Sequence, residues 1–428
     1  MKQKISSKLI AGATLVALTF TLTACDPPMP PEVAAQVLEQ NYTCVEGTSS
    51  ISYPAGLLPV VPDLNDALTN ACVDPLPVMS QSISKTQADA NIVITNYALP
   101  TTCQPLLSVP YAIEAADIAF QITDASNLTL SPATANAILS GQITNWNDPK
   151  ISEDNQGMEF PDLAIKVRAT ADPMALDALA GWFKNLKQDL GAIKVKAGAA
   201  NQKFKPLAEG EIAILPHSDV VAQSLYSAGI LIGTNKDTGE ELIAIADAQG
   251  IASAGTQLKP IKKANNLNVK LDLSIEPVAQ AGLDEISTPY QAIYPVQLTI
   301  CGEESKVNRA NALFLLRLDS QGVLGSSNYN QIPEQIRYAA LAIVRKGLPT
   351  PSARRPPPQP PPAASPADST PPSRRGCPGQ RPRRACFDKS RTRPGRRRRW
   401  PPRPGSRARR SRASAGRTGQ IGRASCRE

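Results

Sequence analysis

The chain has 428 residues and a formal charge of +9, and that charge is unevenly distributed. Residues 351–428 hold 22 Lys and Arg against three acids, 16 of the 40 prolines, and no Leu, Val or Met. Residues 1–350 therefore carry a net charge of −10, which excludes a basic nucleic-acid-binding surface over the folded part. A segment whose one large aliphatic residue is Ile421 cannot bury a core, so we expect a disordered tail over 350–428. The rest is long enough for two lobes.

The N-terminus has the pattern of an export signal. Lys2, Lys4 and Lys8 precede a mostly apolar stretch, 9–22, that is short for a membrane span. The next residues, Leu22-Thr23-Ala24-Cys25, resemble a bacterial lipobox. We expect 1–24 to be a lipoprotein signal peptide, and a lipid on Cys25 to hold the protein at the outer face of the cytoplasmic membrane, on the cell surface or in the periplasm. The alternative is an ordinary signal peptide with a chance cysteine. Prolines in 25–40 predict a stiff tether.

The cysteines fit an oxidising compartment, where disulfides persist. Besides Cys25, the folded region contains Cys44, Cys72, Cys103 and Cys301, which allow three pairings that sequence alone does not decide. With no Cys-x-x-Cys and a single histidine, we expect no metal site.

His217 is that histidine, and a Ser-His-Asp triad would have to use it. We interpret it instead as a surface turn residue. No other nucleophile–base pattern is present, so we expect no enzyme activity. The absence of GxGxxG and of a phosphate-binding loop predicts no nucleotide cofactor.

In chain order, a buried strand is predicted at 117–122. Ser131 as N-cap and Pro132 as first helical residue then predict a helix over 133–140, which Gly141 ends.

A second strand is predicted at 163–168, and Asp172 and Pro173 predict the start of the next helix. Trp146 and Trp182 are interpreted as core residues. The remaining predicted elements are strands at 211–215 and 294–300, and helices at 311–318 and after Pro333. Strands that alternate with helices predict an α/β fold.

Residues 128–151 resemble a segment of the phosphate-binding lipoproteins of ABC transporters. The matching positions are Ile138, Gly141, Ile143, Trp146, Asp148, Pro149 and Ile151. Weaker similarities follow in family order at 91–99, 210–215, from Tyr294, and at 329–333, so the resemblance covers about 45–349.

The resemblance implies a type II periplasmic solute-binding fold with two α/β lobes and a two-segment hinge. The first lobe would take 41–112 and 276–349, and the second 113–275. It also implies the pairs Cys44–Cys72 and Cys103–Cys301, the second near the hinge crossings. The implied protein is a monomer that binds a small anion, phosphate or similar, and serves an ABC permease.

The same resemblance implies an oxyanion site between the lobes. Its donors would be Thr48, Ser49, Ser50, Ser80 (or Ser82), Thr95, Asn96, Arg168 and Thr170. Two positions depart from the family. Asn96 stands in place of an aspartate, and Asp172-Pro173-Met174 replaces a donor-rich helix start. Asp172 puts a carboxylate where the anion should lie and could pair with Arg168.

Three function classes remain open. The first is phosphate or oxyanion binding for an importer. The second is a surface-anchored domain whose ligand is altered or lost, acting as a sensor or scaffold. The third is polyanion binding by the Arg-rich tail.

Residues 1–350 have 19 Lys and five Arg, whereas 351–428 have one Lys and 21 Arg. This switch is typical of an out-of-frame reading of GC-rich DNA, and the last residues resemble a translated sequencing adapter. The alternative is a genuine basic tail.

Overall fold

A computed structural model describes residues 42, 44–72, 77–81, 90–123, 125–156, 158–199, 204–278 and 287–348. Cys25, the signal and tether segments, Ser82 and the 350–428 tail lie outside these residues. Within the described ranges, no helix combines the length and apolar character needed to cross a bilayer.

The described strands are β1 (Gly47–Ser52), β2 (Pro77–Gln81), β3 (Ile92–Thr95), β4 (Pro105–Phe120), β5 (Thr129–Leu130), β6 (Lys166–Val167), β7 (Thr170–Ala171), β8 (Lys196–Ala197), β9 (Glu211–Pro216), β10 (Tyr226–Ser227), β11 (Gly229–Thr234), β12 (Glu241–Ala244), β13 (Leu258–Lys263), β14 (Asn266–Leu271), β15 (Ile293–Cys301) and β16 (Asn330–Gln331). The described helices are η1 (Ala55–Val60), α2 (Val61–Ala71), α3 (Pro132–Leu139), α4 (Pro149–Asp154), α5 (Pro173–Asn185), η2 (Leu190–Ala192), α6 (His217–Ala222), α7 (Ala248–Gly255), α8 (Lys306–Leu315), α9 (Leu318–Gly322), η3 (Val323–Ser327) and α10 (Glu334–Val344).

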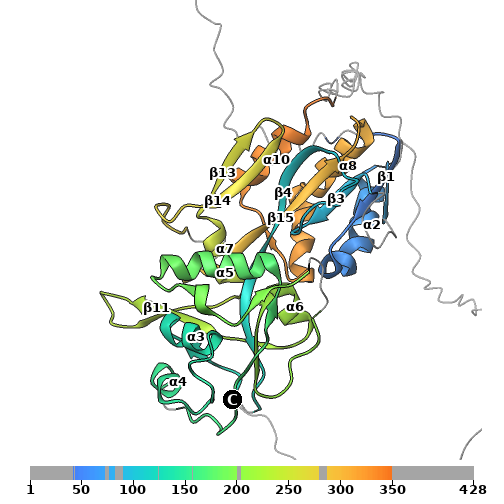
Figure 1. Ribbon diagram of the computed structural model, residues 1–428. Coiled ribbons are helices and arrows are strands. Elements are labelled where there is room, and N and C mark those ends of the chain that lie inside the picture. Colours follow the sequence, from blue (N-terminus) through green and yellow to red (C-terminus); the bar gives the residue numbers. More distant parts are fainter. Residues whose placement is uncertain are drawn as a thin grey trace, which may run out of the picture. The chain divides into compact units, whose positions relative to one another are not determined.

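β4 is a single long strand that serves two sheets, and it can be followed in Figure 1. From Pro105 to Ala115 it pairs antiparallel with β15, and from Ala116 to Phe120 it pairs antiparallel with β9. We call the elements around these two halves the first and the second lobe. β4 is buried on both faces from Val109 onward, which explains its almost continuous apolar sequence.

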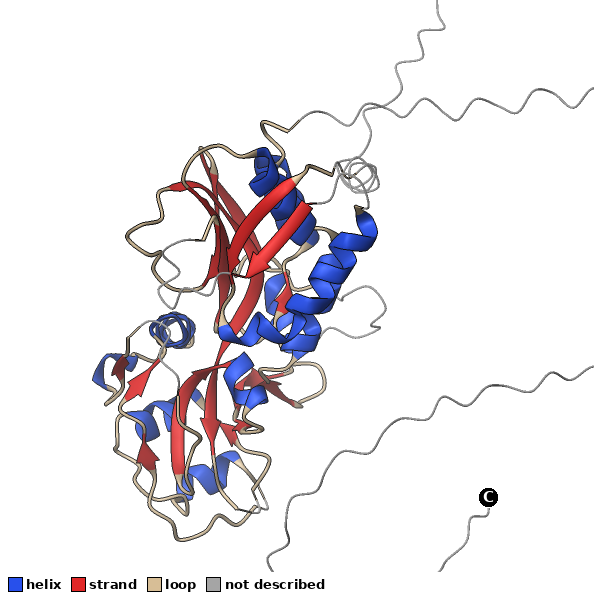
Figure 2. Ribbon diagram, turned by 90° about the vertical axis from the view of Figure 1, so that its right-hand side faces the viewer, coloured by secondary structure: helices blue, strands red, loops and turns tan. Residues whose placement is uncertain are grey.

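The first lobe is built on the strand order β13-β14-β4-β15-β3-β1-β2. Helix α8 contacts β1, β2 and β15, and helix α10 contacts β4, β13 and β14. Figure 2 shows these helices (blue) along the strands (red).

The second lobe joins β4 to β9, β6 and β10, and a separate sheet has the order β12-β11-β5. Helix α5 contacts both β4 and β9. Trp146 is fully buried and donates its indole N–H to the Gly210 carbonyl (3.2 Å). Trp182 is also buried and packs edge-on against Tyr290, with 4.7 Å between ring centroids. Both tryptophans are core residues, as expected, and the α/β fold class is confirmed.

One predicted boundary is wrong. The sequence placed 113–275 in the second lobe, but β13 and β14 belong to the sheet of the first, where Asn266 of β14 pairs with Ser108 of β4. The chain therefore returns to the first lobe after α7, near Gln257. The β13–β14 hairpin supplies partners for the backbone groups of β4 on the side away from β15, which would otherwise be unpaired.

The local start signals of the helices are confirmed. The Ser131 hydroxyl accepts from the Thr134 N–H (3.2 Å) at the start of α3, and Asp172 caps α5. The helix expected at 311–318 instead begins at Lys306, because Ser305 caps it by accepting from the Asn308 N–H (3.4 Å).

Two strands differ in length from the prediction. The strand expected at 117–122 is the end of β4, which stops at Phe120. The strand expected at 163–168 is reduced to Lys166–Val167. The backbone of 163–165 bonds instead to the irregular Thr144–Trp146 segment.

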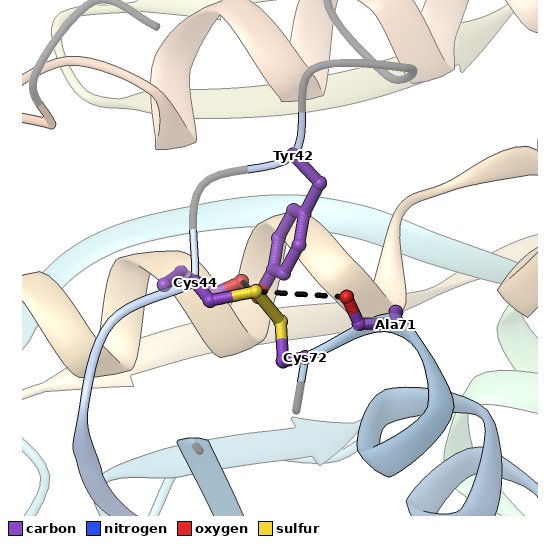
Figure 3. The surroundings of a disulfide bond; sticks show 5 residues. Tyr42, Cys44, Ala71 and Cys72 are labelled. Atoms are coloured by element: carbon purple, nitrogen blue, oxygen red, sulfur yellow. Dashed lines mark hydrogen bonds between the residues drawn. A yellow bond between two sulfur atoms is a disulfide. The ribbon is translucent and has the colours of Figure 1, made fainter. Parts of the chain in front are cut away.

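The structure pairs Cys44 with Cys72 and Cys103 with Cys301, the two pairs that the resemblance implies. Figure 3 shows the first bond beside Tyr42 at the end of α2. The second does not lie near the lobe crossing. Cys301 is in register with Pro105, and Ala116, where β4 changes partner, is 11 residues further along. At roughly 3.3 Å per residue, that distance is about 36 Å. This bond therefore joins the start of β4 to the end of β15.

Candidate functional site

The serines and threonine expected in the first ligand loop lie on strand β1. Ser49 is fully buried, and its hydroxyl donates to Asn308 Oδ1 (2.7 Å) and accepts from Asn311 Nδ2 (3.0 Å). Thr48 is exposed. The Ser50 backbone N–H donates to Asn91 Oδ1 (3.0 Å). The Ser49 hydroxyl therefore holds α8 against β1 and is not available to a ligand.

The next expected donors are also engaged within the protein. Ser80 on β2 donates to the Ser49 carbonyl (3.3 Å). Thr95 ends β3, and its hydroxyl accepts from the Tyr97 N–H (3.0 Å). Asn96 is buried between these two residues. Of the expected first-lobe donors, only Thr95 and Asn96 lie at a strand end next to a group that reaches the second lobe.

Arg168 does not offer a free guanidinium fork. Its Nη1 donates to the Lys205 carbonyl (2.7 Å), and its Nη2 donates to the Pro206 carbonyl (3.2 Å) and to Glu211 Oε2 (3.1 Å). The pairing of Arg168 with Asp172 that the sequence suggested is therefore wrong, because Glu211 of β9 takes that place. Arg168 thus holds Glu211, at the start of β9, close to the Lys205–Pro206 segment that precedes this strand.

The start of α5 is neutralised by the chain itself. Asp172 is buried, and its Oδ1 accepts from the Met174 N–H (2.9 Å) and the Ala175 N–H (3.0 Å). These are N–H groups that an anion at a helix N-terminus would use. Thr170 lies just before, on β7, in register with Lys196. A carboxylate thus occupies the place expected for the ligand's negative charge.

The second oxygen of Asp172 connects the lobes. Asp172 Oδ2 accepts a hydrogen bond from the Tyr97 hydroxyl, so α5 of the second lobe is joined to the residue after β3 of the first. Burial and then this bond raise the pKa of Tyr97 well above its ordinary value. The phenol therefore remains a proton donor at any physiological pH.

Around this bond lies a set of polar groups from both lobes, which we call the interlobe cluster. The first lobe contributes groups from β4, β15 and the segments after β3 and η3, and the second contributes the starts of α5 and α6. Its members are Tyr97, Glu114, Asp172, Ser218, Asp219, Tyr294 and Tyr329.

Glu114 is as deeply buried as Asp172, each with 1% of its surface exposed. Its Oε2 accepts from the Ser218 hydroxyl (2.6 Å), and its Oε1 accepts from the backbone N–H groups of Ala115 (3.0 Å) and Ser218 (3.3 Å). Burial raises the pKa of Glu114 to about 7, although the Ser218 hydrogen bond and the charge of His217 oppose the rise. Near neutral pH this carboxyl can therefore donate or accept a proton.

His217 is not a surface residue, contrary to the expectation. It starts α6, and its Nδ1 lies 3.0 Å from Asp117 Oδ2, with 12% of its side chain exposed. Burial lowers the pKa of His217, but the hydrogen bond and charge of Asp117 outweigh it and leave the pKa raised. The neighbouring Ser218 hydroxyl donates to Glu114, so these residues do not form a Ser-His-Asp relay.

The cluster was missed because its members come from six distant segments. One signal was present in the sequence. Glu114 and Asp117 interrupt an otherwise apolar strand, and both are buried. An acid inside a strand that is buried on both faces must have partners from elsewhere in the fold.

Comparisons with known proteins give similarity only to solved structures. No family model matches the chain, and neither does any curated protein. An ABC-type phosphate transport receptor from Vibrio cholerae is 11% identical with a TM-score of 0.34, covering 66% of this chain and 99% of its own. A phosphate-binding protein from Stenotrophomonas maltophilia is 11% identical (TM-score 0.37; 69% and 94% covered). An ancestral soluble variant of the human phosphate-binding protein is 13% identical (TM-score 0.43; 69% and 93% covered). At these values the similarity does not assign the chain to a family.

Proposed function

We propose that the chain is an extracytoplasmic solute-binding protein that holds its ligand at the interlobe cluster, and that this ligand differs from phosphate. The observation that carries the proposal is the state of the expected oxyanion donors. Arg168 has three acceptors inside the protein, and Asp172 occupies the N-terminus of α5. To use these donors, an anion would have to displace the acceptors of Arg168 and the carboxylate of Asp172.

The cluster supports a binding role because it joins the two lobes through polar groups. Tyr97 and Asp172 are hydrogen-bonded across the lobes, and the carboxyl groups of Asp172 and Glu114 are both buried. Such groups are costly to bury and are common at binding sites. The cluster also lies where β4 passes from one lobe to the other, so a ligand there would contact both lobes.

The cellular setting is part of the proposal. Two disulfides favour a compartment outside the cytoplasm. In this proposal, Cys25 carries the lipid that anchors a monomer, and an ABC permease receives the solute. A sensor or scaffold role would use the same anchored domain without a permease.

Phosphate is the second candidate ligand. Glu114 favours it, because a carboxyl with a pKa of about 7 can accept the proton of a partly protonated oxyanion. The carboxylate of Asp172 at the N-terminus of α5 argues against phosphate as the ligand.

Calorimetry on the purified full chain, stripped of bound solute, tests the proposal. We expect no heat with phosphate or sulfate, and binding of at least one solute from a panel of amines, amino acids and sugars. Phosphate binding with a micromolar or lower dissociation constant would show that the ligand is phosphate and would favour a role in phosphate import. If no solute of the panel binds, the solute-binding proposal fails and the scaffold role is favoured.

A further inference from the structure

The carboxylates of Glu114 and Asp172 are hydrogen-bonded to neutral groups, and His217, whose charge also acts on Glu114, is itself paired with Asp117. Glu114 accepts from backbone N–H groups and the Ser218 hydroxyl, and Asp172 accepts from backbone N–H groups and the Tyr97 hydroxyl. Within the described residues, no lysine or arginine forms an ion pair with either of them or with Asp219. Burial and then the charge of Asp172 raise the pKa of Asp219. Apart from the charge of His217 on Glu114, the described residues therefore provide little positive charge to compensate the cluster's carboxyl groups.

A second, independent feature points to a missing partner. Tyr294 of β15 is 4% exposed, and its hydroxyl has no hydrogen-bond partner among the described residues. Tyr294 is paired with Glu114 in the register of β15 and β4, so the two side chains lie on the same face of the sheet. The charges of Glu114 and Asp172 add to the effect of burial in raising the pKa of Tyr294. Buried hydroxyl groups are nearly always hydrogen-bonded, so an unpartnered one aimed at acidic groups is where a ligand atom would be recognised.

The chemistry of these groups selects one ligand class. An anion would be repelled by the carboxylates of Asp172 and Asp219. A metal ion is disfavoured, because no three His, Cys, Asp or Glu side chains in the described ranges converge on a possible ion position. A protonated amine has the required sign, offers up to three N–H donors to oxygen atoms, and is accommodated by aromatic rings. The oxygens and rings available are those of Tyr97, Tyr294 and Tyr329.

We propose that the interlobe cluster binds a small protonated amine, with its ammonium group between the Tyr294 hydroxyl and the carboxylates of Asp172 and Asp219. This inference rests on the proposed solute-binding function and names its ligand class. Asp172 belongs to the second lobe and Tyr294 to the first, so an ammonium group bound to both would add a polar link to the hydrogen bonds that already join the lobes at Tyr97–Asp172 and Ser218–Glu114.

The test is calorimetry on the full chain with putrescine and ethanolamine as probes, beside phosphate, sulfate and a neutral sugar. Tyr294→Phe removes only the unpartnered hydroxyl, and we expect it to weaken amine binding at least about tenfold, the loss typical of one hydrogen bond to a charged group. Tyr111→Phe is the matched control. Tyr111 is also buried, its hydroxyl has no hydrogen-bond partner among the described residues, and the ionisable neighbour that acts on it is Tyr53, outside the cluster. Amine binding should therefore be unchanged.

Three outcomes would overturn the inference. One is the absence of heat with either amine. Another is an equal effect of the two tyrosine variants. The third is binding of phosphate, sulfate or the sugar in place of the amines, which would leave the solute-binding function standing with a different ligand. Thermal unfolding confirms that each variant folds. If Tyr294→Phe does not, Asp219→Asn takes its place with the same expected loss.

Discussion

Replacing Glu114 by glutamine should change how stability depends on pH. The folded-state pKa of Glu114 is about 7, against an ordinary value of 4.5 for the unfolded chain. Between these values the folded protein binds more protons than the unfolded one, so stability falls as pH rises. At roughly 1.4 kcal/mol for each pH unit, this difference corresponds to a loss of about 3 kcal/mol between pH 4.5 and pH 7.

Glutamine removes this loss because it has no charge to desolvate. Its carbonyl can still accept from the Ala115 and Ser218 N–H groups that now bond to Oε1. His217 adds a loss of the same sign in both proteins, because its raised pKa gives stability at low pH that disappears as pH rises through the folded-state value. Because His217 is present in both proteins, its contribution largely cancels when the unfolding free energy of the wild type is subtracted from that of the Glu114→Gln variant.

The assay is guanidinium unfolding between pH 4.5 and 8 with the disulfides intact, followed by the fluorescence of the buried Trp146 and Trp182. Between pH 4.5 and 8, we expect the unfolding free energy of the variant to rise by about 3 kcal/mol relative to that of the wild type. Glu240→Gln removes an exposed carboxylate, and its unfolding free energy should depend on pH in the same way as that of the wild type. If Glu114→Gln also ran parallel, burial of this carboxyl would not govern the pH dependence.

Three further outcomes follow from other contacts. Ser131→Ala removes the N-cap of α3 and should lower the unfolding free energy by about 1 kcal/mol, whereas Ser131→Asp should retain most of it; equal unfolding midpoints for the alanine variant and the wild type would contradict the capping role. The Cys103→Ala/Cys301→Ala double variant opens a cross-link between residues 198 apart and should lose about 5 kcal/mol, against about 4 kcal/mol for Cys44→Ala/Cys72→Ala, whose partners are 28 apart; denaturant melts that reverse this order would refute the chain-entropy reasoning. Arg168→Ala releases the carbonyls of Lys205 and Pro206 and should speed proteolysis of that segment without changing solute affinity; a loss of solute binding would instead place Arg168 at the site.

The sequence predicted best what neighbouring residues decide. Ser131-Pro132 and Asp172-Pro173 mark helix starts because a side-chain oxygen, a fixed proline φ and the first N–H groups lie within three residues of one another. The strand at 211–215 was equally legible, since β9 is buried and apolar.

Contacts between distant segments were not predicted in this way. Ser49 was expected in a ligand loop, but α8, about 260 residues later, brings Asn308 and Asn311 onto its hydroxyl. Arg168 was expected at the ligand, but Glu211, 43 residues away, takes its guanidinium. Each side chain has the chemistry that an anion site needs. Which acceptor or donor it meets depends on the register of the sheets, which residue type alone does not reveal.

Asp172 shows how a small local change can alter a whole site. As N-cap it neutralises the positive end of α5 with its Oδ1, and with its Oδ2 it accepts from Tyr97 across the lobes. A helix start that is rich in N–H donors attracts anions, whereas one capped by a buried carboxylate repels them. The same residue therefore excludes an oxyanion from the end of α5 and adds to the negative charge that faces Tyr294. The proposed preference for a protonated amine therefore depends on one residue that also forms a link between the lobes.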